Sequence, residues 1–118
     1  MSRRRRAERA GRAAETACAR LLRLKGYRVL ARRYRSAVGE IDIIARRGAL
    51  IAVIEVKARR DYAAAVEAVD SGQRARIERA AAMFLAENAA FASLAVRFDV
   101  MVVLPWRLPV HLEDAWRP

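Results

Sequence analysis

Three charged residues near the middle of the chain have types and spacings that suit metal-dependent chemistry on phosphate esters. Glu55 and Lys57 alternate with apolar residues at the end of the segment Ala49 to Val56. In a strand, this alternation places the carboxylate and the ammonium on one face. Asp42 lies in an apolar segment just before. Partly burying such charges is costly unless they are paired or bind an ion, so the cluster indicates a site.

The position of Asp42 depends on the turn between the two segments. Both segments flank a short turn that contains Gly48, a pattern that favours a β-hairpin. If the turn holds an even number of residues, Asp42 shares the face of Glu55 and Lys57, at roughly 5–8 Å from Glu55. Two carboxylates this close repel unless a divalent cation lies between them. Mg²⁺ or Mn²⁺ accepts such oxygen ligands, and the backbone carbonyl of Val56 is a further candidate ligand.

A solvent-exposed Glu-x-Lys pair, with Asp42 in a turn, is the alternative. The segment Ala49 to Val56 is apolar on both of its faces, however, which is typical of a covered central strand. A metal held by Asp42 and Glu55 would activate water and stabilise charge on a scissile phosphate. Lys57 would then position the water and neutralise the pentacovalent state. This chemistry is that of a phosphodiesterase.

The composition is that of a small, strongly basic protein. The chain has 118 residues and a formal net charge of +11, which predicts one domain with a polyanionic partner. We expect a disordered basic arm over residues 1–6 and a single nuclease-like domain over residues 7–118. No apolar run approaches the roughly 18–20 residues that span a bilayer, so no membrane partner is expected. The single cysteine, Cys18, predicts a core position and a reducing, cytoplasmic compartment, and the single histidine, His111, is interpreted as structural.

Hydrophobic periodicity predicts an α/β domain with one mixed central sheet. Residues 58–70 fit either a helix or a loop. The expected elements are helices over 7–25 and 72–88, strands over 27–34, 40–45, 49–56 and 95–104, and a short last element over 110–116.

These motifs resemble the YraN-like family of small bacterial proteins. That family is described as related to archaeal Holliday junction resolvases, within the PD-(D/E)XK restriction-endonuclease-like superfamily. The resemblance rests on Gly39 to Ala45 and on Val53 to Arg59, and it implies a restriction-endonuclease-like mixed sheet flanked by helices. Supporting matches are Gly11 to Glu15, Gly26-Tyr27, Arg97 to Val100 and Leu112 to Trp116.

The resemblance implies a role for each candidate site residue. Asp42 and Glu55 match the metal-binding acids, and Lys57 matches the catalytic lysine. Glu15 matches a first-helix glutamate that reaches the metal site in resolvase-like members, with a solvated surface carboxylate as the alternative. Gln73 falls in the first turn of the long helix, where related nucleases carry a polar residue near the site. A helix-capping glutamine is the alternative there, because family members more often have a lysine nearby.

Arginines flank the predicted site in the sequence. They would contact phosphates without reading bases, and so set the affinity and its salt dependence. A basic surface without function is the alternative. One of them, Arg33, occupies a place where the family pattern has asparagine. The candidates for nucleic-acid binding are Arg32, Arg33, Arg35, Arg59 and Arg60.

We therefore predict a Mg²⁺- or Mn²⁺-dependent endonuclease that hydrolyses phosphodiester bonds of DNA. The resemblance implies branched or junction DNA as the substrate, and cutting both strands of a junction would favour a homodimer. DNA is the expected partner, with RNA as the alternative. Two other functions stay open: a nucleic-acid-binding module that keeps the nuclease fold without catalysis, and a small basic RNA- or ribosome-associated protein.

Overall fold

The strands lie side by side in the order in which they occur in the chain. The computed structural model describes residues 2–118, apart from the side chain of Ala7. Within these residues one sheet has the order β1-β2-β3-β4-β5. Neighbouring strands are antiparallel except for β3 and β4, which run parallel. The strands are β1 (Arg28–Ser36), β2 (Gly39–Arg47), β3 (Leu50–Ala58), β4 (Ala95–Val103) and β5 (Val110–Trp116).

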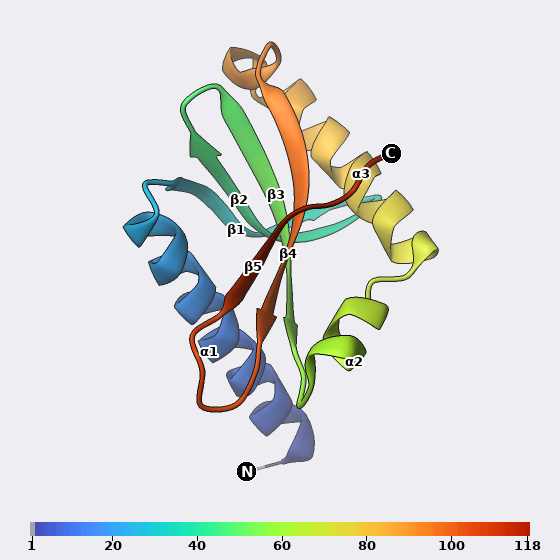
Figure 1. The fold of residues 1–118 in the computed structure, drawn as a ribbon. Coiled ribbons are helices and arrows are strands. Elements are labelled where there is room, and N and C mark those ends of the chain that lie inside the picture. The colour runs from blue at the N-terminus through green and yellow to red at the C-terminus, as the bar shows by residue number, and fades with distance from the viewer. Residues whose placement is uncertain (1) are drawn as a thin grey trace.

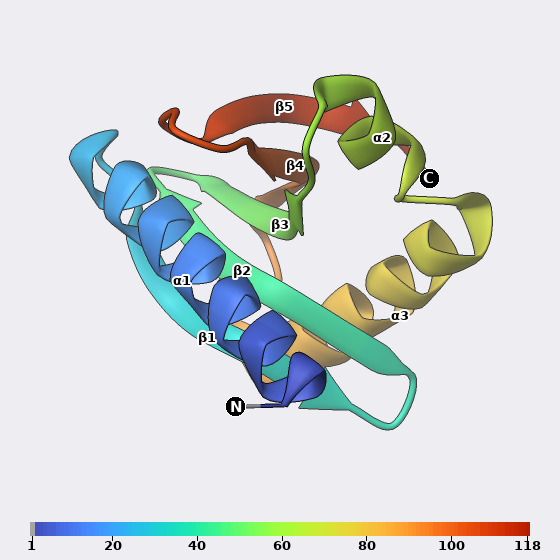
Figure 2. The same ribbon diagram turned by 90° about the horizontal axis from the view of Figure 1, so that it is seen from below.

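Helices cover both faces of this sheet (Figures 1 and 2). Helix α1 (Arg3–Leu24) lies across one face, and α2 (Tyr62–Glu67) and α3 (Ser71–Glu87) lie on the other. The last two, with the 3₁₀ turn η1 (Ala89–Phe91), form the crossover that a parallel pair of strands requires. The predicted α/β fold class, a restriction-endonuclease-like mixed sheet flanked by helices, is confirmed. No helix in the described residues is both long enough and apolar enough to cross a membrane.

The sheet has an apolar core on each face. On the α3 face, Phe98, Val100 and Val102 of β4 share one core with Ile77 and Phe84 of α3. On the α1 face, Cys18 is fully buried, which confirms its predicted core position, and burial raises the pKa of its thiol to about 12. The α1-side core contains Cys18, Ala19, Leu22, Tyr27, Ile43, Ala45, Ala52, Ile54 and Met101, and the α3-side core includes Ile41, Ile51, Val53, Ile77, Phe84, Phe98, Val100 and Val102.

Helix α1 begins earlier than the sequence suggested. The prediction of a disordered arm over residues 1–6 is wrong for residues 3–6, which form the first turn of α1, and Met1 lies outside the described residues. The cause is local. The Ser2 hydroxyl accepts a hydrogen bond from the backbone N–H of Arg5 and caps the helix. Arg4 then pairs with Glu8 one turn later, at 3.2 Å.

The ambiguous segment, residues 58–70, contains a short helix. The Asp61 carboxylate accepts from the backbone N–H of Ala64 at 2.8 Å and caps α2. The next helix, α3, begins in the same way, because Asp70 accepts from the backbone N–H of Gln73 at 2.8 Å.

Candidate functional site

The β2–β3 hairpin brings Asp42 and Glu55 together. Its register pairs Arg47 with Leu50, so a two-residue turn closes the hairpin. Gly48 in this turn has a φ of 60°, a left-handed conformation that glycine adopts without steric cost. The turn therefore contains an even number of residues, which is the condition for Asp42 to share the face of Glu55. The pairing of Ile43 with Ile54 places Asp42 opposite Glu55, and the charge of Asp42 acts on Glu55.

Burial and mutual repulsion act on both of these carboxyl groups. Glu55 is only 6% exposed, and its burial, followed by the charge of Asp42, raises its pKa to about 7. Burial also raises the pKa of Asp42, although the bond from the Val56 N–H and the charge of Lys57 act in the opposite direction. Two acids that share a site in this way favour a bound cation or a shared proton.

Polar groups from β3 and α3 hold the pair in place. The backbone N–H of Val56 donates to Asp42 Oδ2 at 2.7 Å. Lys57 Nζ lies 3.2 Å from Glu55 Oε1, and the Lys57 side chain is only 13% exposed. Gln73 Nε2, from α3, donates to the same Glu55 oxygen at 3.0 Å. The side chain of Gln73 therefore belongs to this site and does not cap α3.

The acid pair predicts a specific dependence of stability on pH. When folding raises the pKa of an acid, the free energy of unfolding falls as the pH rises from the pKa of the unfolded state to the pKa of the folded state. For Glu55 these two pKa values are 4.5 and about 7. We expect the Asp42→Asn protein, in EDTA, to lose less free energy of unfolding between pH 5 and pH 8 than the wild type does. The difference should be about 1–3 kcal/mol.

Urea unfolding at the two pH values measures this difference. The control is Glu67→Gln, because Glu67 is an exposed carboxylate on α2 that is not among the groups acting on the pKa of either acid. It should keep the pH dependence of the wild type. If Asp42→Asn also keeps that dependence, the two carboxyl groups do not repel each other in solution.

Glu15 is buried on α1 beside the acid pair, but arginines hold both of its oxygens. Arg32 Nε donates to Oε1 at 2.9 Å and Arg33 Nε donates to Oε2 at 3.1 Å. The Glu15 charge also acts on Asp42 and raises its pKa. At 5% exposure, Glu15 is not the solvated surface carboxylate of the alternative interpretation. No group of three His, Cys, Asp or Glu side chains within residues 2–118 is arranged to hold a metal ion, so Glu15 would have to leave its arginines to become a ligand.

The backbone at Arg33 explains how two consecutive residues of a strand reach one carboxylate. Successive strand side chains normally point to opposite faces. Arg33 has a φ of 52°, in the left-handed region that asparagine tolerates better than most residues. Arg33 also lies between the pairs Arg32–Ile43 and Tyr34–Ile41 in the β1–β2 register, directly opposite Asp42.

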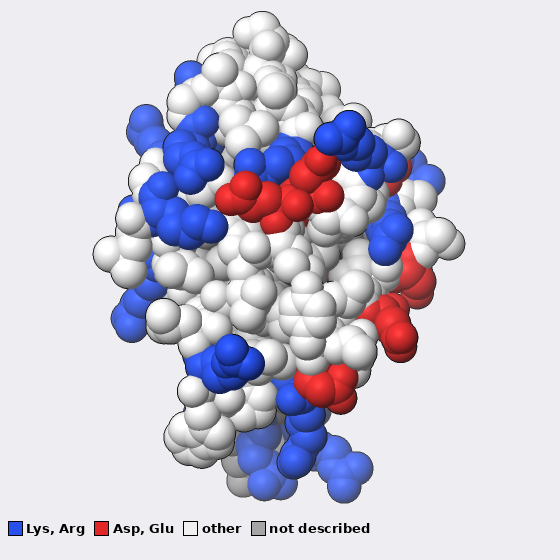
Figure 3. All heavy atoms as spheres, viewed as in Figure 1, with Lys and Arg blue, Asp and Glu red and all other residues white. Residues whose placement is uncertain are grey.

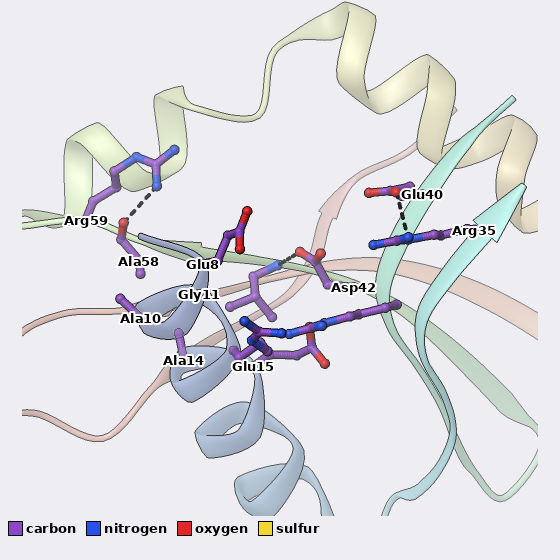
Figure 4. Close-up of a pocket in the computed structure, with 13 residues that line it drawn as sticks. Glu8, Ala10, Gly11, Ala14, Glu15, Arg35, Glu40, Asp42, Ala58 and Arg59 are labelled. Atoms are coloured by element: carbon purple, nitrogen blue, oxygen red, sulfur yellow. Dashed lines mark hydrogen bonds and ion pairs between the residues drawn. The ribbon is translucent and has the colours of Figure 1, made fainter. Parts of the chain in front are cut away.

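A cleft of about 690 Å³ lies between α1 and the strands beside these acids (Figure 4). Asp42 and Glu40 line both this cleft and a neighbouring cavity of about 240 Å³ that reaches Glu55 and Gln73. Of the predicted nucleic-acid-binding arginines, Arg33, Arg35 and Arg59 line the cleft, whereas Arg32 and Arg60 do not. Arg32 is held by Glu15 and by the hydroxyl of Thr16 at 2.9 Å.

Sequence reasoning missed the role of Glu40 and Arg76 around this site. Glu40 lines both cavities and pairs with Arg35 at 3.1 Å. Arg76, from α3, lines the smaller cavity. Glu40 lies in the hairpin motif and could have been considered from its spacing to Asp42, since both lie on β2 two residues apart. Arg76 gave no signal, because only the packing of α3 brings it to β2.

A second polar cluster was also missed, and it is buried on the α1 face of β4. Asp99 is fully buried, and Arg97 donates to both of its oxygens at 2.8 Å. His111 Nε2 lies 2.7 Å from Asp99 Oδ2, and the backbone N–H of Asp114 donates to Oδ1 at 3.0 Å. Lys25 Nζ lies 2.6 Å from the other ring nitrogen of His111. The structural interpretation of His111 is confirmed.

Comparison with known protein families shows to which family the chain belongs. The model of a family described as the uncharacterised protein family UPF0102 matches residues 14–103, which include Glu15, both hairpin acids, Lys57 and Gln73. The chain belongs to the UPF0102 family. This membership confirms the YraN-like family that the motifs resemble.

Curated members of the UPF0102 family resemble the chain over nearly its whole length. A UPF0102 protein of Parvibaculum lavamentivorans is 54% identical over 112 residues, which are 95% of this chain and 84% of the relative. A UPF0102 protein of Paramagnetospirillum magneticum is 51% identical over 115 residues, 94% of this chain and 89% of the relative. One from Mesorhizobium japonicum is 50% identical over 113 residues, 96% of this chain and 90% of the relative. The UPF0102 relatives are therefore of similar extent to this chain.

Proposed function

We propose that this UPF0102 protein is a Mg²⁺- or Mn²⁺-dependent endonuclease that hydrolyses phosphodiester bonds of DNA. The observation that carries the proposal is the acid pair, Asp42 and Glu55. Its pKa values are raised by burial, and Lys57 Nζ lies 3.2 Å from one of its oxygens. A binding protein has no need for two repelling carboxylates beside a half-buried lysine, at the edge of an arginine-lined cleft.

The donor atoms at this site fit a hard divalent cation. Asp42 and Glu55 supply carboxylate oxygens. The N–H and C=O of one strand residue point to the same side, so the Val56 carbonyl faces the side on which its N–H bonds Asp42. Glu15 is a further candidate once its arginines bind something else. When bound, the cation would activate a water molecule and offset the charge that develops on the scissile phosphate.

The other residues of the site have roles that follow from their contacts. Lys57 keeps an ammonium beside Glu55, where it stabilises negative charge that builds up on the phosphate. Gln73 fixes the orientation of the Glu55 carboxylate through the bond at 3.0 Å. Arg33, Arg35 and Arg59 bind backbone phosphates along the cleft.

We further propose branched or junction DNA as the substrate, a homodimer as the form that would cut both strands, and the cytoplasm as the compartment. A nucleic-acid-binding module without catalysis is the second candidate. It is favoured by one specific observation, namely the two arginines that hold both oxygens of Glu15 and keep it from acting as a ligand. RNA in place of DNA is the alternative polymer for either function.

Cleavage of end-labelled DNA tests the proposal. Single-stranded, duplex and four-way-junction DNA of equal length are incubated with the protein in Mg²⁺, Mn²⁺ or EDTA, beside an RNA of matched sequence. We expect metal-dependent nicks, most frequent on the junction. The control is the double variant Asp42→Asn with Lys57→Met, which keeps side-chain volumes and removes the proposed chemistry. If the protein binds every DNA and cuts none with either metal, the binding module is correct, and a preference for RNA supports the ribosome-associated alternative.

A further inference from the structure

The loop between β4 and β5 exposes a tryptophan completely. Trp106 is 102% exposed and Leu108 is 79% exposed, and Pro105 and Pro109 enclose them in the sequence. Trp106 also has a φ of 61°, a strained conformation for a bulky residue. The other tryptophan, Trp116, is only 7% exposed and packs inside the protein. The exposed Trp106 and Leu108 together form a candidate contact surface for a partner.

The loop lies at the end of the sheet that carries the candidate site. Because β3 and β4 are parallel, the register that pairs Lys57 with Val102 also puts the end of β4 beside the end of β3. The N–H of Arg59 donates to the carbonyl of Val103 at 3.2 Å and fastens the start of the loop there. Figure 1 shows the loop, the end of β3 and the start of α1 at the same, lower end of the molecule.

The charge around the loop selects the kind of partner. Residues 101–112 include Arg107 and contain no Asp or Glu, and basic side chains gather at the lower end of the molecule in Figure 3. A second copy of a chain with a net charge of +11 would bring like charges together at this end. A partner with anionic groups and flat apolar faces complements the loop, and a nucleic acid with unpaired bases has both.

We propose that Trp106 stacks on an unpaired base of the DNA that occupies the site, at a strand end, a single-stranded segment or a branch point. The rigid turn between Pro105 and Pro109 presents the indole face, Leu108 extends the apolar contact, and Arg107 binds the adjoining phosphate. The loop thereby makes the protein prefer DNA with unpaired bases over intact duplex. This inference relies on the proposed function for the identity of the polymer and is independent of catalysis.

Binding in EDTA, where no cleavage occurs, tests the inference. Fluorescence anisotropy of labelled single-stranded and duplex DNA of equal length is measured for the wild type, Trp106→Ala and Trp106→Phe. We expect Trp106→Ala to bind the single strand about tenfold more weakly than the wild type does, and to bind the duplex with an affinity within about twofold of wild type. Trp106→Phe should keep most of the affinity for the single strand. Leu24→Ala is the matched control, because Leu24 is 85% exposed at the far end of α1. A single strand that contains 2-aminopurine should lose fluorescence on binding the wild type but not Trp106→Ala.

Two outcomes would overturn the inference. One is a loss of affinity in Trp106→Ala that is equal for single strand and duplex, or no loss at all. The other is sedimentation that shows a dimer of the wild type which Trp106→Ala abolishes, with DNA binding unchanged, since the loop would then join two copies. Binding without cleavage refutes the nuclease and leaves this test valid, whereas failure to bind any DNA refutes both proposals.

Discussion

Asp42→Asn is expected to lower the rate of metal-dependent DNA cleavage on the order of 10³-fold. The substitution keeps the shape of the side chain and its bond from the Val56 N–H, but removes one of the two charges that would hold the cation. DNA affinity in EDTA should stay the same or rise slightly, because the cleft loses a negative charge. Single-turnover cleavage of the preferred DNA measures the rate, and anisotropy in EDTA measures the affinity.

The matched control for this prediction is Asp61→Asn. Asp61 also accepts a backbone N–H bond, from Ala64 at 2.8 Å, but it is exposed and lines neither cavity of the site. It should cleave at close to the wild-type rate. A second readout is the midpoint of thermal unfolding, which Mg²⁺ should raise for the wild type and for Asp61→Asn but not for Asp42→Asn. Equal cleavage by Asp42→Asn and wild type would place the chemistry elsewhere.

Asp99→Ala is expected to reduce the free energy of unfolding by about 3–5 kcal/mol. Burial alone would raise the pKa of Asp99, but the bonds from His111, Arg97 and the Asp114 N–H lower it below its usual range. Removing the carboxylate leaves the Arg97 guanidinium and His111 without their buried acceptor. Urea unfolding at neutral pH measures the loss.

The pH dependence of this prediction has the opposite sign to that of the acid pair. Because the folded pKa of Asp99 is depressed, its contribution is present above the unfolded value and is lost as the pH falls through the folded one. The difference in stability between wild type and Asp99→Ala should therefore shrink in acid. Glu67→Gln is the control, since Glu67 is an exposed carboxylate on α2 outside this cluster. A loss in Asp99→Ala no larger than in that control would mean that the cluster contributes little.

The acid pair could be predicted because every step that forms it is local. Period-two alternation predicted the faces of β2 and β3, and Gly48 predicted a hairpin turn between them. The sequence left the parity of that turn open, and the structure shows that it is even. Gln73 followed from resemblance, and its contact with Glu55 depends on how α3 packs. The spacing of charged residues along two neighbouring strands was thus enough to predict that Asp42 and Glu55 lie together.

The Asp99 cluster could not be predicted in this way. Its members come from the end of α1, from β4 and from β5, and only the folded sheet brings them together. The one signal was the alternation of Arg97 and Asp99 on a strand, which is also common on surfaces. The left-handed backbone at Arg33 was equally invisible, because arginine has no preference for that conformation. The early start of α1 depended on a single capping hydroxyl, that of Ser2.

The two-residue turn between β2 and β3 also bears on how the protein folds. Closing so short a turn costs little chain entropy, whereas the β3–β4 pair must wait for a long connection to close. We expect Asp42 and Glu55 therefore to meet while much of the chain is still unstructured, so that their repulsion opposes the early steps of folding as well as the finished structure. We therefore expect the charges of the acid pair to slow folding, and a proton or a divalent cation that relieves their repulsion to accelerate it.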